Sequence, residues 1–224
     1  MPPRAFFDSQ PQALHPRYIA IEGPIHVGKS RLVEILAERV HARRILDCRD
    51  NPFLRDFYED RAGAGFASQM YFLMQRYKLL KEFDSSASYA STILSDFIFE
   101  RDKIFAFINL GDEELRIYEQ YFSLLSEQLP KPDLVIYLQT TTEALMRRIE
   151  KSEKNFEGQI SFDYLTEVVK AFDHFFFHYS ATDLLVINTA EIDFVERNED
   201  LNDLLHRLQQ PVKGTQYYLP LKSK

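Results

Sequence analysis

The feature that most constrains this chain is one short stretch near its start, Gly23-Pro24-Ile25-His26-Val27-Gly28-Lys29-Ser30. It fits the pattern G-x-x-x-x-G-K-[S/T] at every fixed position. Glycines let backbone amides approach a phosphate chain closely, the lysine reaches the outer phosphates, and the serine hydroxyl can bind the accompanying magnesium. All eight residues are therefore candidates for binding the phosphates of ATP with Mg²⁺.

The segments on either side of this stretch support the same interpretation. Residues 18–21 form a short, mostly apolar run that suits a buried strand, and residues 31–43 place apolar side chains at helical spacing. A glycine turn that merely precedes a helix is the alternative. The spacing of the glycines excludes a dinucleotide-binding turn of the type G-x-G-x-x-G.

Composition narrows the class of protein further. The 224 residues contain no linker, repeat or low-complexity block, so we expect one domain over residues 1–224. A net charge of -7 argues against a nucleic-acid-binding surface. Cys48 is the only cysteine, residues 1–16 resemble a frayed leader more than a signal peptide, and no segment is long enough to span a membrane. We therefore expect a cytoplasmic protein without membrane or nucleic-acid partners.

Predicted strands and helices alternate along the chain. Further strands are expected at 44–48, 90–95, 134–138 and 184–187. Helices are expected after Pro52 and at 66–83, 97–110, 112–128, 140–149, 161–179 and 194–209. This order predicts an α/β fold of three layers, with a five-stranded parallel sheet and helices on both faces.

Several polar residues occupy positions that suit a binding site. Asp47 and Asp96 come at the ends of two predicted strands, where parallel sheets bind their ligands. Gln69 and Arg76 lie seven residues apart on one helix, so they share a face that could line a cleft. The charged run at 147–154 suits either a solvated surface or a lid over phosphates, and we place the lid at about 150–158.

From about residue 18 to residue 187, the chain resembles the deoxyribonucleoside kinases, a family within the phosphate-loop nucleoside and nucleotide kinases. The phosphate loop is common to many families, whereas other matches are more specific. They are Asn51-Pro52-Phe53-Leu54 with Phe57-Tyr58, Gln69 with Arg76, Asp96 and Asp102 before Ile104-Phe105-Ala106, a lid ending at Glu157, and Tyr164-Leu165. The bacterial members that act on deoxyadenosine or deoxyguanosine resemble it most.

The resemblance implies roles for the acidic residues. Asp47 stands where the family usually has a glutamate that accepts the proton of the sugar 5'-hydroxyl, and either acid can do this within hydrogen-bond reach. Glu22 and Asp50 are the alternatives for this base. Ser30 and Asp96 are expected to hold the magnesium ion.

The same resemblance implies the nucleoside site. Tyr58 and Glu157 match positions that hold the sugar 3'-hydroxyl, and Gln69 matches the residue that pairs with the base. Asp102 is expected to be a second group that reads the base, with Arg76 as its charged neighbour. Arg101 is the alternative to Asp102.

Two departures concern the cations expected at the transferring phosphate. The family often has an arginine where this chain has Phe97, and its lid usually carries arginines where this chain has Arg148, Ser152 and Lys154. We assign catalytic roles to Lys29, Arg148 and Lys154. The residues that could compensate for the missing arginines are Arg101, Arg147, Arg148, Lys151 and Lys154.

The sequence thus predicts transfer of the ATP γ-phosphate to the 5'-hydroxyl of a deoxynucleoside, with purines favoured by the resemblance, for nucleotide salvage. Family habit implies a homodimer. One rival is a nucleoside monophosphate kinase such as thymidylate kinase, which needs a cationic pocket for the acceptor phosphate. The other is a non-catalytic nucleotide-binding or structural subunit, motivated by Phe97 and Ser152.

Overall fold

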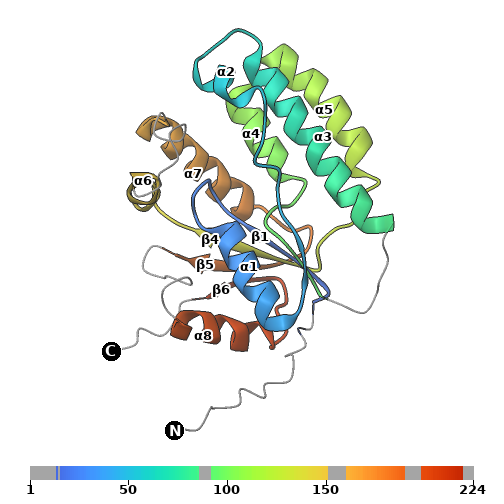
Figure 1. Ribbon diagram of the computed structural model, residues 1–224, viewed down its shortest axis with the longest axis vertical. Helices are drawn as coiled ribbons and strands as arrows, with labels where there is room; N and C mark the ends of the chain where they lie inside the picture. Colours follow the sequence, from blue (N-terminus) through green and yellow to red (C-terminus); the bar gives the residue numbers. More distant parts are fainter. Residues whose placement is uncertain (1–13, 15, 86–91, 151–159, 190–197, 219–224) are drawn as a thin grey trace, which may run out of the picture.

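The computed structural model describes residues 14, 16–85, 92–150, 160–189 and 198–218. Its central layer is a parallel sheet of six strands in the order β2-β3-β1-β4-β5-β6 (Figure 1). The bounds are Tyr18–Glu22 for β1, Arg43–Ile45 for β2, Ile93–Ser95 for β3, Leu134–Gln139 for β4, Asp183–Asn188 for β5 and Thr215–Tyr218 for β6. The central strands β1 and β4 are almost wholly apolar because helices cover both of their faces.

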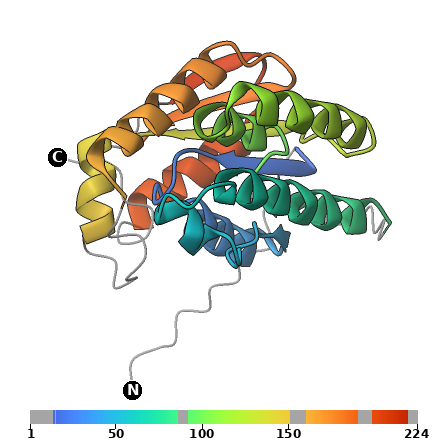
Figure 2. The ribbon, with the colours of Figure 1, turned by 90° about the horizontal axis from the view of Figure 1, so that it is seen from above.

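The helices complete the three layers that the sequence predicts. Their bounds are Lys29–Val40 for α1, Leu54–Tyr58 for α2, Ala64–Ser85 for α3, Arg101–Asn109 for α4, Asp112–Ser126 for α5, Thr142–Glu150 for α6, Phe162–Phe177 for α7 and Asn198–Leu208 for α8. Helices α1 and α7 lie on opposite sides of the sheet (Figure 2). Helices α3, α4 and α5 pack side by side as one group, which stands above the sheet in Figure 1.

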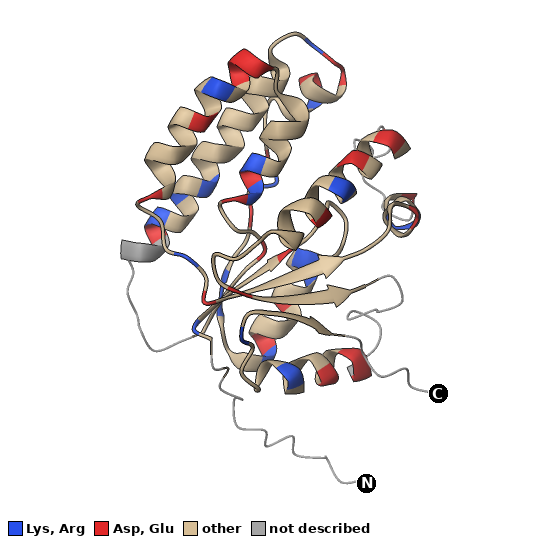
Figure 3. Ribbon diagram, turned by 180° about the vertical axis from the view of Figure 1, so that it is seen from behind, with Lys and Arg blue, Asp and Glu red and all other residues tan. Residues whose placement is uncertain are grey.

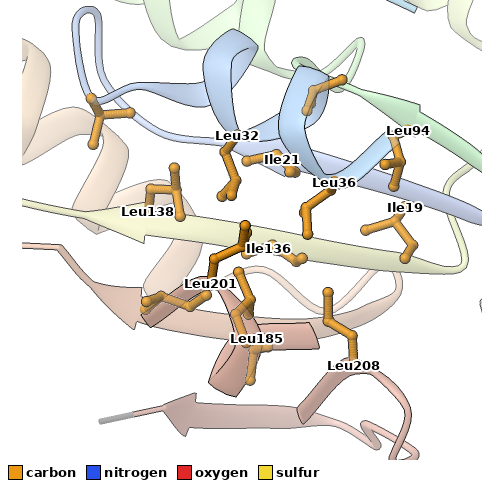
Figure 4. Close-up of a cluster of buried hydrophobic side chains, with 14 of the residues drawn as sticks. Ile19, Ile21, Leu32, Leu36, Leu94, Ile136, Leu138, Leu185, Leu201 and Leu208 are labelled. Atoms are coloured by element: carbon orange, nitrogen blue, oxygen red, sulfur yellow. The ribbon is translucent and has the colours of Figure 1, made fainter. Parts of the chain in front are cut away.

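Alternation along β1 divides the core into two clusters. Ile19 and Ile21 point toward α1, where they meet Leu32 and Leu36 (Figure 4). Tyr18 and Ala20 belong to the second cluster on the other face, with residues of α3, α4, α5 and α7. Because successive side chains of a strand face opposite ways, one short strand anchors both layers.

Charged residues lie mainly on the helices and near the ends of strands, and the strand interiors carry few of them (Figure 3). The apolar interior thus belongs to the sheet, and the polar groups gather where the strands end. Among the helices of the described residues, none combines the length and the apolarity needed to cross a membrane.

The structure differs from the predicted elements in three places. The sheet has a sixth strand, β6, which pairs with β5 and which we did not predict. Strand β2 ends at Ile45 rather than residue 48, because the next amides turn away from the sheet and that of Asp47 bonds to a side chain. Helix α4 starts at Arg101 rather than residue 97, because the amide of Ile98 donates to Glu22.

Parts of two predicted segments fall outside the described residues. Of the expected leader at 1–16, the structure describes Leu14 and Pro16, and Leu14 is buried against the core rather than frayed. Of the expected lid at about 150–158, only Glu150 is described, as the last residue of α6. Lys154 and Glu157 therefore have no described position.

Candidate active site

The glycine-rich loop between β1 and α1 has the backbone that a phosphate cradle requires. Gly23 has φ +151°, and a Cβ at this position would lie 2.6 Å from the carbonyl oxygen of Leu138. Gly28 has φ +99° and caps α1 without a side-chain hydrogen bond. His26 adopts a left-handed conformation at φ +59°. The first turn of α1 therefore presents its backbone amides toward the loop, which favours an anion.

Lys29 lies folded back over this loop. Its Nζ donates to the carbonyl oxygens of Gly23 at 2.8 Å and Pro24 at 2.7 Å. Burial lowers the pKa of Lys29, the charge of Arg101 lowers it further, and Glu22 opposes the shift, which leaves a pKa of about 7. Among the described residues, the hydrogen bonds of this buried Nζ go to these two carbonyl groups, so the group is poised to gain an anionic partner.

Asp96 links the phosphate loop to the second acidic residue of the site. One of its carboxylate oxygens accepts from the Ser30 hydroxyl, and the other accepts from the backbone amide of Asp47 at 2.6 Å. Asp96 follows β3 directly, and Asp47 follows β2, so neighbouring strands bring the two together. The expectation that both acids meet the loop at one edge of the sheet agrees with these contacts.

Two arginines hold the Asp47 carboxylate. Arg76 binds it with two prongs, Nε to Oδ1 at 3.0 Å and Nη2 to Oδ2 at 2.9 Å. Nη1 of Arg101 also donates to Oδ2, at 2.9 Å. Burial by itself would raise the pKa of Asp47, but the charges of Arg76 and Arg101 outweigh burial and hold that pKa below its usual range. Asp47 is therefore ionised and oriented.

Behind this pair lies a second buried ion pair. Nη1 of Arg76 contacts Oδ1 of Asp102, and Tyr118 donates its hydroxyl to Oδ2 of Asp102 at 3.0 Å. Asp102 is fully buried. Nε2 of Gln69 donates to the backbone carbonyl of Asp102 at 2.9 Å. Asp102 thus orients both Arg76 and Gln69, the two residues that the sequence places on one helix face.

These groups surround a cavity of about 450 Å³, a size that fits a small-molecule site. The phosphate loop forms one end, and residues of α2 and α3 form the other. Of the site residues that the sequence predicts, ten line the cavity: Ile25, His26, Gly28, Lys29, Ser30, Asp47, Tyr58, Gln69, Arg76 and Asp96. The structure therefore brings the predicted phosphate end and the predicted nucleoside end to one space.

Five other predicted residues are described but do not line the cavity: Gly23, Pro24, Val27, Asp102 and Arg148. The first three shape the loop, and Asp102 acts from behind Arg76. Arg148 donates to the carbonyl oxygens of Val27 and Thr189, both at 3.1 Å, so it contacts the back of the phosphate loop.

The two alternatives to Asp47 as a base lie in other surroundings. Glu22 is fully buried, does not line the cavity, and accepts from the amides of Gly23 at 2.9 Å and Ile98 at 2.8 Å. Asp50 is exposed and also does not line the cavity. Asp47 is thus the one of the three candidates that faces the space between the two ends. Arg101, the alternative to Asp102, lines the cavity as well.

Sequence reasoning missed the aromatic wall of the cavity. Phe57, Phe72, Phe105 and Tyr164 line it, and the Arg76 guanidinium lies 4.9 Å from the centre of the Phe72 ring. A signal for Phe72 was available, because it lies three residues after Gln69 and four before Arg76, on the same helix face. Phe105 and Tyr164 come from other helices, and like Phe57 they were matched to the family's motifs without being assigned to the site.

The oxygen ligands near the loop suit a magnesium ion. Mg²⁺ prefers carboxylate, hydroxyl, water and phosphate oxygens, and it usually takes one or two ligands from the protein. Ser30 and Asp96 offer a hydroxyl and a carboxylate in direct contact beside the cradle. Within the described part of the chain, no cluster of three or more His, Cys, Asp or Glu side chains could hold a metal. The fit is therefore to an ion that arrives with phosphates.

A parallel sheet, a glycine loop that cradles phosphate and an adjoining cavity with an ionised carboxylate define a phosphate-loop phosphotransferase. Comparison with known proteins specifies the family. The model of the deoxynucleoside kinase family matches residues 19–213, and the chain belongs to this family. The family that the sequence resembles is thereby confirmed.

Curated relatives carry matching names. The chain is 33% identical over 158 residues to deoxyguanosine kinase of Bacillus subtilis (strain 168), which covers 70% of this chain and 76% of that protein. It is 27% identical over 207 residues to deoxyadenosine/deoxycytidine kinase of the same organism, which covers 88% of this chain and 94% of that protein.

A solved structure shares the fold. Deoxyadenosine kinase from M. mycoides with bound dATP superposes with a TM-score of 0.74 at 22% identity, covering 86% of this chain and 100% of that chain. The three-layer α/β fold that the sequence predicts is confirmed, with a sixth strand added to the sheet.

Proposed function

We propose a function for this protein within its family, whose members are phosphotransferases that phosphorylate deoxynucleosides. We propose that it transfers the γ-phosphate of ATP to the 5'-hydroxyl of a purine deoxynucleoside in nucleotide salvage. The observation that carries this proposal is the shared cavity, which has Lys29 and Ser30 at one end, Gln69 at the other, and Asp47 between them. The names of the relatives, which include deoxyadenosine and deoxyguanosine kinases, support the choice of purines.

At the phosphate end, the loop amides and Lys29 bind the triphosphate. On gaining phosphate oxygens, Nζ of Lys29 exchanges the two carbonyl groups that hold it for an anionic partner. Ser30 and Asp96 would hold the Mg²⁺ that arrives with ATP, and this ion would neutralise charge on the phosphates. Arg148 supports the loop from behind through Val27. We also propose that Lys154 adds charge from the lid.

At the acceptor end, Asp47 takes the proton of the 5'-hydroxyl. Its carboxylate lines the cavity beside Lys29 and Ser30, and its lowered pKa keeps it ionised at neutral pH. The arginines that cause this ionisation also make Asp47 a weak base. Its contribution is therefore to orient the hydroxyl and to accept the proton as the new bond forms.

Gln69 is suited to recognise a base. Its amide nitrogen already donates to the Asp102 carbonyl, and its side-chain oxygen receives no hydrogen bond from any described residue. That oxygen can accept from an amino group on the edge of a base, and the Phe72 ring offers a face for stacking. We propose that Tyr58 and Glu157 hold the sugar 3'-hydroxyl, and that Asp102 acts through Arg76 and Gln69.

An acceptor screen tests this function. The protein is incubated with ATP, Mg²⁺ and either deoxyadenosine, deoxyguanosine, deoxycytidine, thymidine or their 5'-monophosphates, and the products are identified by mass spectrometry. We expect purine deoxynucleoside 5'-monophosphates and ADP. Turnover of monophosphates alone would instead identify a nucleoside monophosphate kinase. ATP binding without phosphorylation of any acceptor would identify a non-catalytic subunit.

We also propose that two copies associate through the outer face of α4, α5 and α7. These helices form a mostly apolar hollow of about 710 Å³ whose lining includes Phe107, which is 76% exposed. Its lining carries both signs of charge, with Lys103 and Lys170 near Glu119 and Glu167. A second copy turned by a two-fold axis would bring unlike charges together while covering Phe107.

Light scattering on wild type and two variants tests the association. Phe107→Asp should give a monomer at micromolar concentration, because it places a charge in an interface that excludes water. Leu124→Asp is the matched control, since Leu124 is 63% exposed but lies outside this hollow. A monomeric wild type, or equal effects of the two substitutions, would contradict the proposal.

We further propose that residues 1–224 form one kinase domain with its lid at about 150–158, and that the protein is cytoplasmic.

A further inference from the structure

Arg101, the first residue of α4, lines the cavity and is one of several cations that could replace the arginines missing from this chain. We infer that Arg101 is a catalytic residue that leaves Asp47 when substrates bind and contacts the transferring phosphoryl group. This inference rests on the proposed kinase reaction and adds a residue to it. Four observations support it: the full coordination of Asp47, the weaker attachment of Arg101, an unpartnered buried nitrogen, and the position of Phe97.

The first observation is that the Asp47 carboxylate has no vacant lone pair. A carboxylate offers about four acceptor positions. Oδ1 accepts from Nε of Arg76 at 3.0 Å and from the Cys48 amide at 2.9 Å, and Oδ2 accepts from Nη2 of Arg76 and Nη1 of Arg101, both at 2.9 Å. A sugar hydroxyl can donate its proton to Asp47 only after one of these four donors leaves.

The donors differ in how firmly they are held. The Cys48 amide belongs to the next residue of the backbone, so it moves with Asp47 itself. Arg76 binds Asp47 through two nitrogens and Asp102 through the third. Arg101 binds Asp47 through one nitrogen and forms no other described ion pair. The donor that a substrate displaces at the lowest cost is therefore Arg101.

The Nε atom of Arg101 indicates that this side chain lacks a hydrogen-bond acceptor. Its Nε is buried and has no hydrogen-bond partner in the described structure, although Arg101 is only 7% exposed. A buried donor without an acceptor is unfavourable, and a guanidinium is well suited to bind an anion through two nitrogens. The Phe105 ring, 5.6 Å from the guanidinium carbon, favours a positive charge at this place.

The anion that fits is the outer phosphate of the nucleotide. Arg101 and Lys29 line the same cavity, and the charge of Arg101 contributes to lowering the pKa of Lys29. Lys29, which bonds to two carbonyl groups, and Arg101, which has Asp47 as its described ion-pair partner, thus face the space where the γ-phosphate would lie. Phe97, two residues after β3, carries no charge, and its ring is fully buried among apolar side chains. Arg101 reaches the place from the next helix.

The 5'-oxygen forms a bond to the γ-phosphorus while the bond between this phosphorus and the β–γ bridging oxygen breaks. The hydroxyl proton passes to Asp47, and ADP and the deoxynucleoside 5'-monophosphate result. Arg101 stabilises the charge on the transferring group. Its departure from Asp47 also removes one of the charges that weaken the carboxylate as a base.

The experiment compares kcat for a purine deoxynucleoside in wild type, Arg101→Ala and Arg101→Lys, together with the Kd of ATP. We expect kcat of Arg101→Ala to fall about 10³-fold, and Arg101→Lys to fall less, because lysine keeps the charge without the planar fork. The Kd of ATP, measured without a deoxynucleoside, should change by less than about threefold, because Arg101 stays on Asp47 until the sugar hydroxyl displaces it and so makes no contact with ATP alone. Added guanidinium should restore part of the activity of Arg101→Ala, and ammonium should not.

Arg116→Ala is the control, since Arg116 is an exposed arginine of α5 that does not line the cavity. It should retain wild-type kcat. A wild type that phosphorylates no deoxynucleoside would overturn the proposed function. If wild type is active and kcat of Arg101→Ala lies within about fivefold of the wild-type kcat, the role of Arg101 would be overturned while the proposed function would stand. If Arg101→Ala does not fold, Arg101→Gln replaces it, and an unchanged kcat would have the same meaning.

Discussion

The two ends of the cavity are built in different ways. The phosphate end comes from one uninterrupted segment, the loop from Gly23 to Ser30 and the start of α1. The acceptor end comes from three separate segments, which contribute Asp47, Gln69 with Arg76, and Arg101 with Asp102. Asp96 joins the two ends by bonding to Ser30 and to the Asp47 amide. A contiguous site depends on backbone conformation, whereas an assembled site depends on buried charges that hold it together.

The largest expected effect concerns those buried charges. Asp102→Asn should lower the free energy of unfolding by about 3–5 kcal/mol, because it leaves Arg76 buried with one partner fewer. The double variant Arg76→Met with Asp102→Leu should not recover the lost stability, because Asp47 would lose its two-pronged partner. Urea denaturation measures both. An Asp102→Asn protein as stable as wild type would mean that the acceptor end does not depend on this ion pair.

This difference also explains what the sequence could reveal. The phosphate loop could be predicted because its glycines and Lys29 lie together in the sequence. The glycines allow the backbone to approach a phosphate, and Lys29 supplies a positive charge. The strand-end position of Asp47 could be predicted from the alternation of elements. The arginines that hold it could not, because Arg76 and Arg101 reach Asp47 from 29 and 54 positions away in the chain.

The wrong boundaries have a related cause. Residues 97–100 have an apolar pattern compatible with a helix, but the Ile98 amide bonds to the buried Glu22 side chain instead. Strand β6 was not predicted, because an exposed edge strand with half-buried side chains gives little periodic signal in the sequence. Local patterns therefore identified the elements, and side-chain to backbone contacts decided where they begin and end.

The second-largest expected effect concerns the phosphate end of the cavity, which one continuous segment forms. Gly23→Ala should lower the free energy of unfolding by about 2–3 kcal/mol, because the new Cβ would collide with the Leu138 carbonyl at 2.6 Å. If this strain falls on the cradle, the affinity for ATP should fall by roughly 100-fold. Calorimetric titration with ATP measures this affinity.

Gly63→Ala provides the control for that substitution. Gly63 has φ +75° and no atom within 4 Å of an added Cβ, so the substitution causes backbone strain without a collision. It should cost about 1 kcal/mol of stability and leave the affinity for ATP unchanged. Equal effects of the two substitutions on ATP binding would contradict a specific role for Gly23.

A smaller effect should separate recognition of the base from chemistry. Gln69→Leu should lower kcat/KM for purine deoxynucleosides by roughly 10- to 100-fold, since it leaves a buried amino group of the base without an acceptor. The Kd of ATP should stay the same, because Gln69 lies at the far end of the cavity. Steady-state kinetics with both substrates varied tests this. If Gln69→Leu changed only the Kd of ATP, the base of the deoxynucleoside would bind away from Gln69.

The central claim is that Lys29 and Asp47 act on one phosphoryl transfer within a shared cavity. Single-turnover transfer from γ-labelled ATP to deoxyguanosine, in wild type, Lys29→Ala and Asp47→Asn, tests it most directly. We expect wild type to form the 5'-monophosphate, and the two variants to be slower by about 10²-fold or more. Asp47→Asn should still bind ATP as wild type does. Transfer at the wild-type rate by Asp47→Asn would contradict the account.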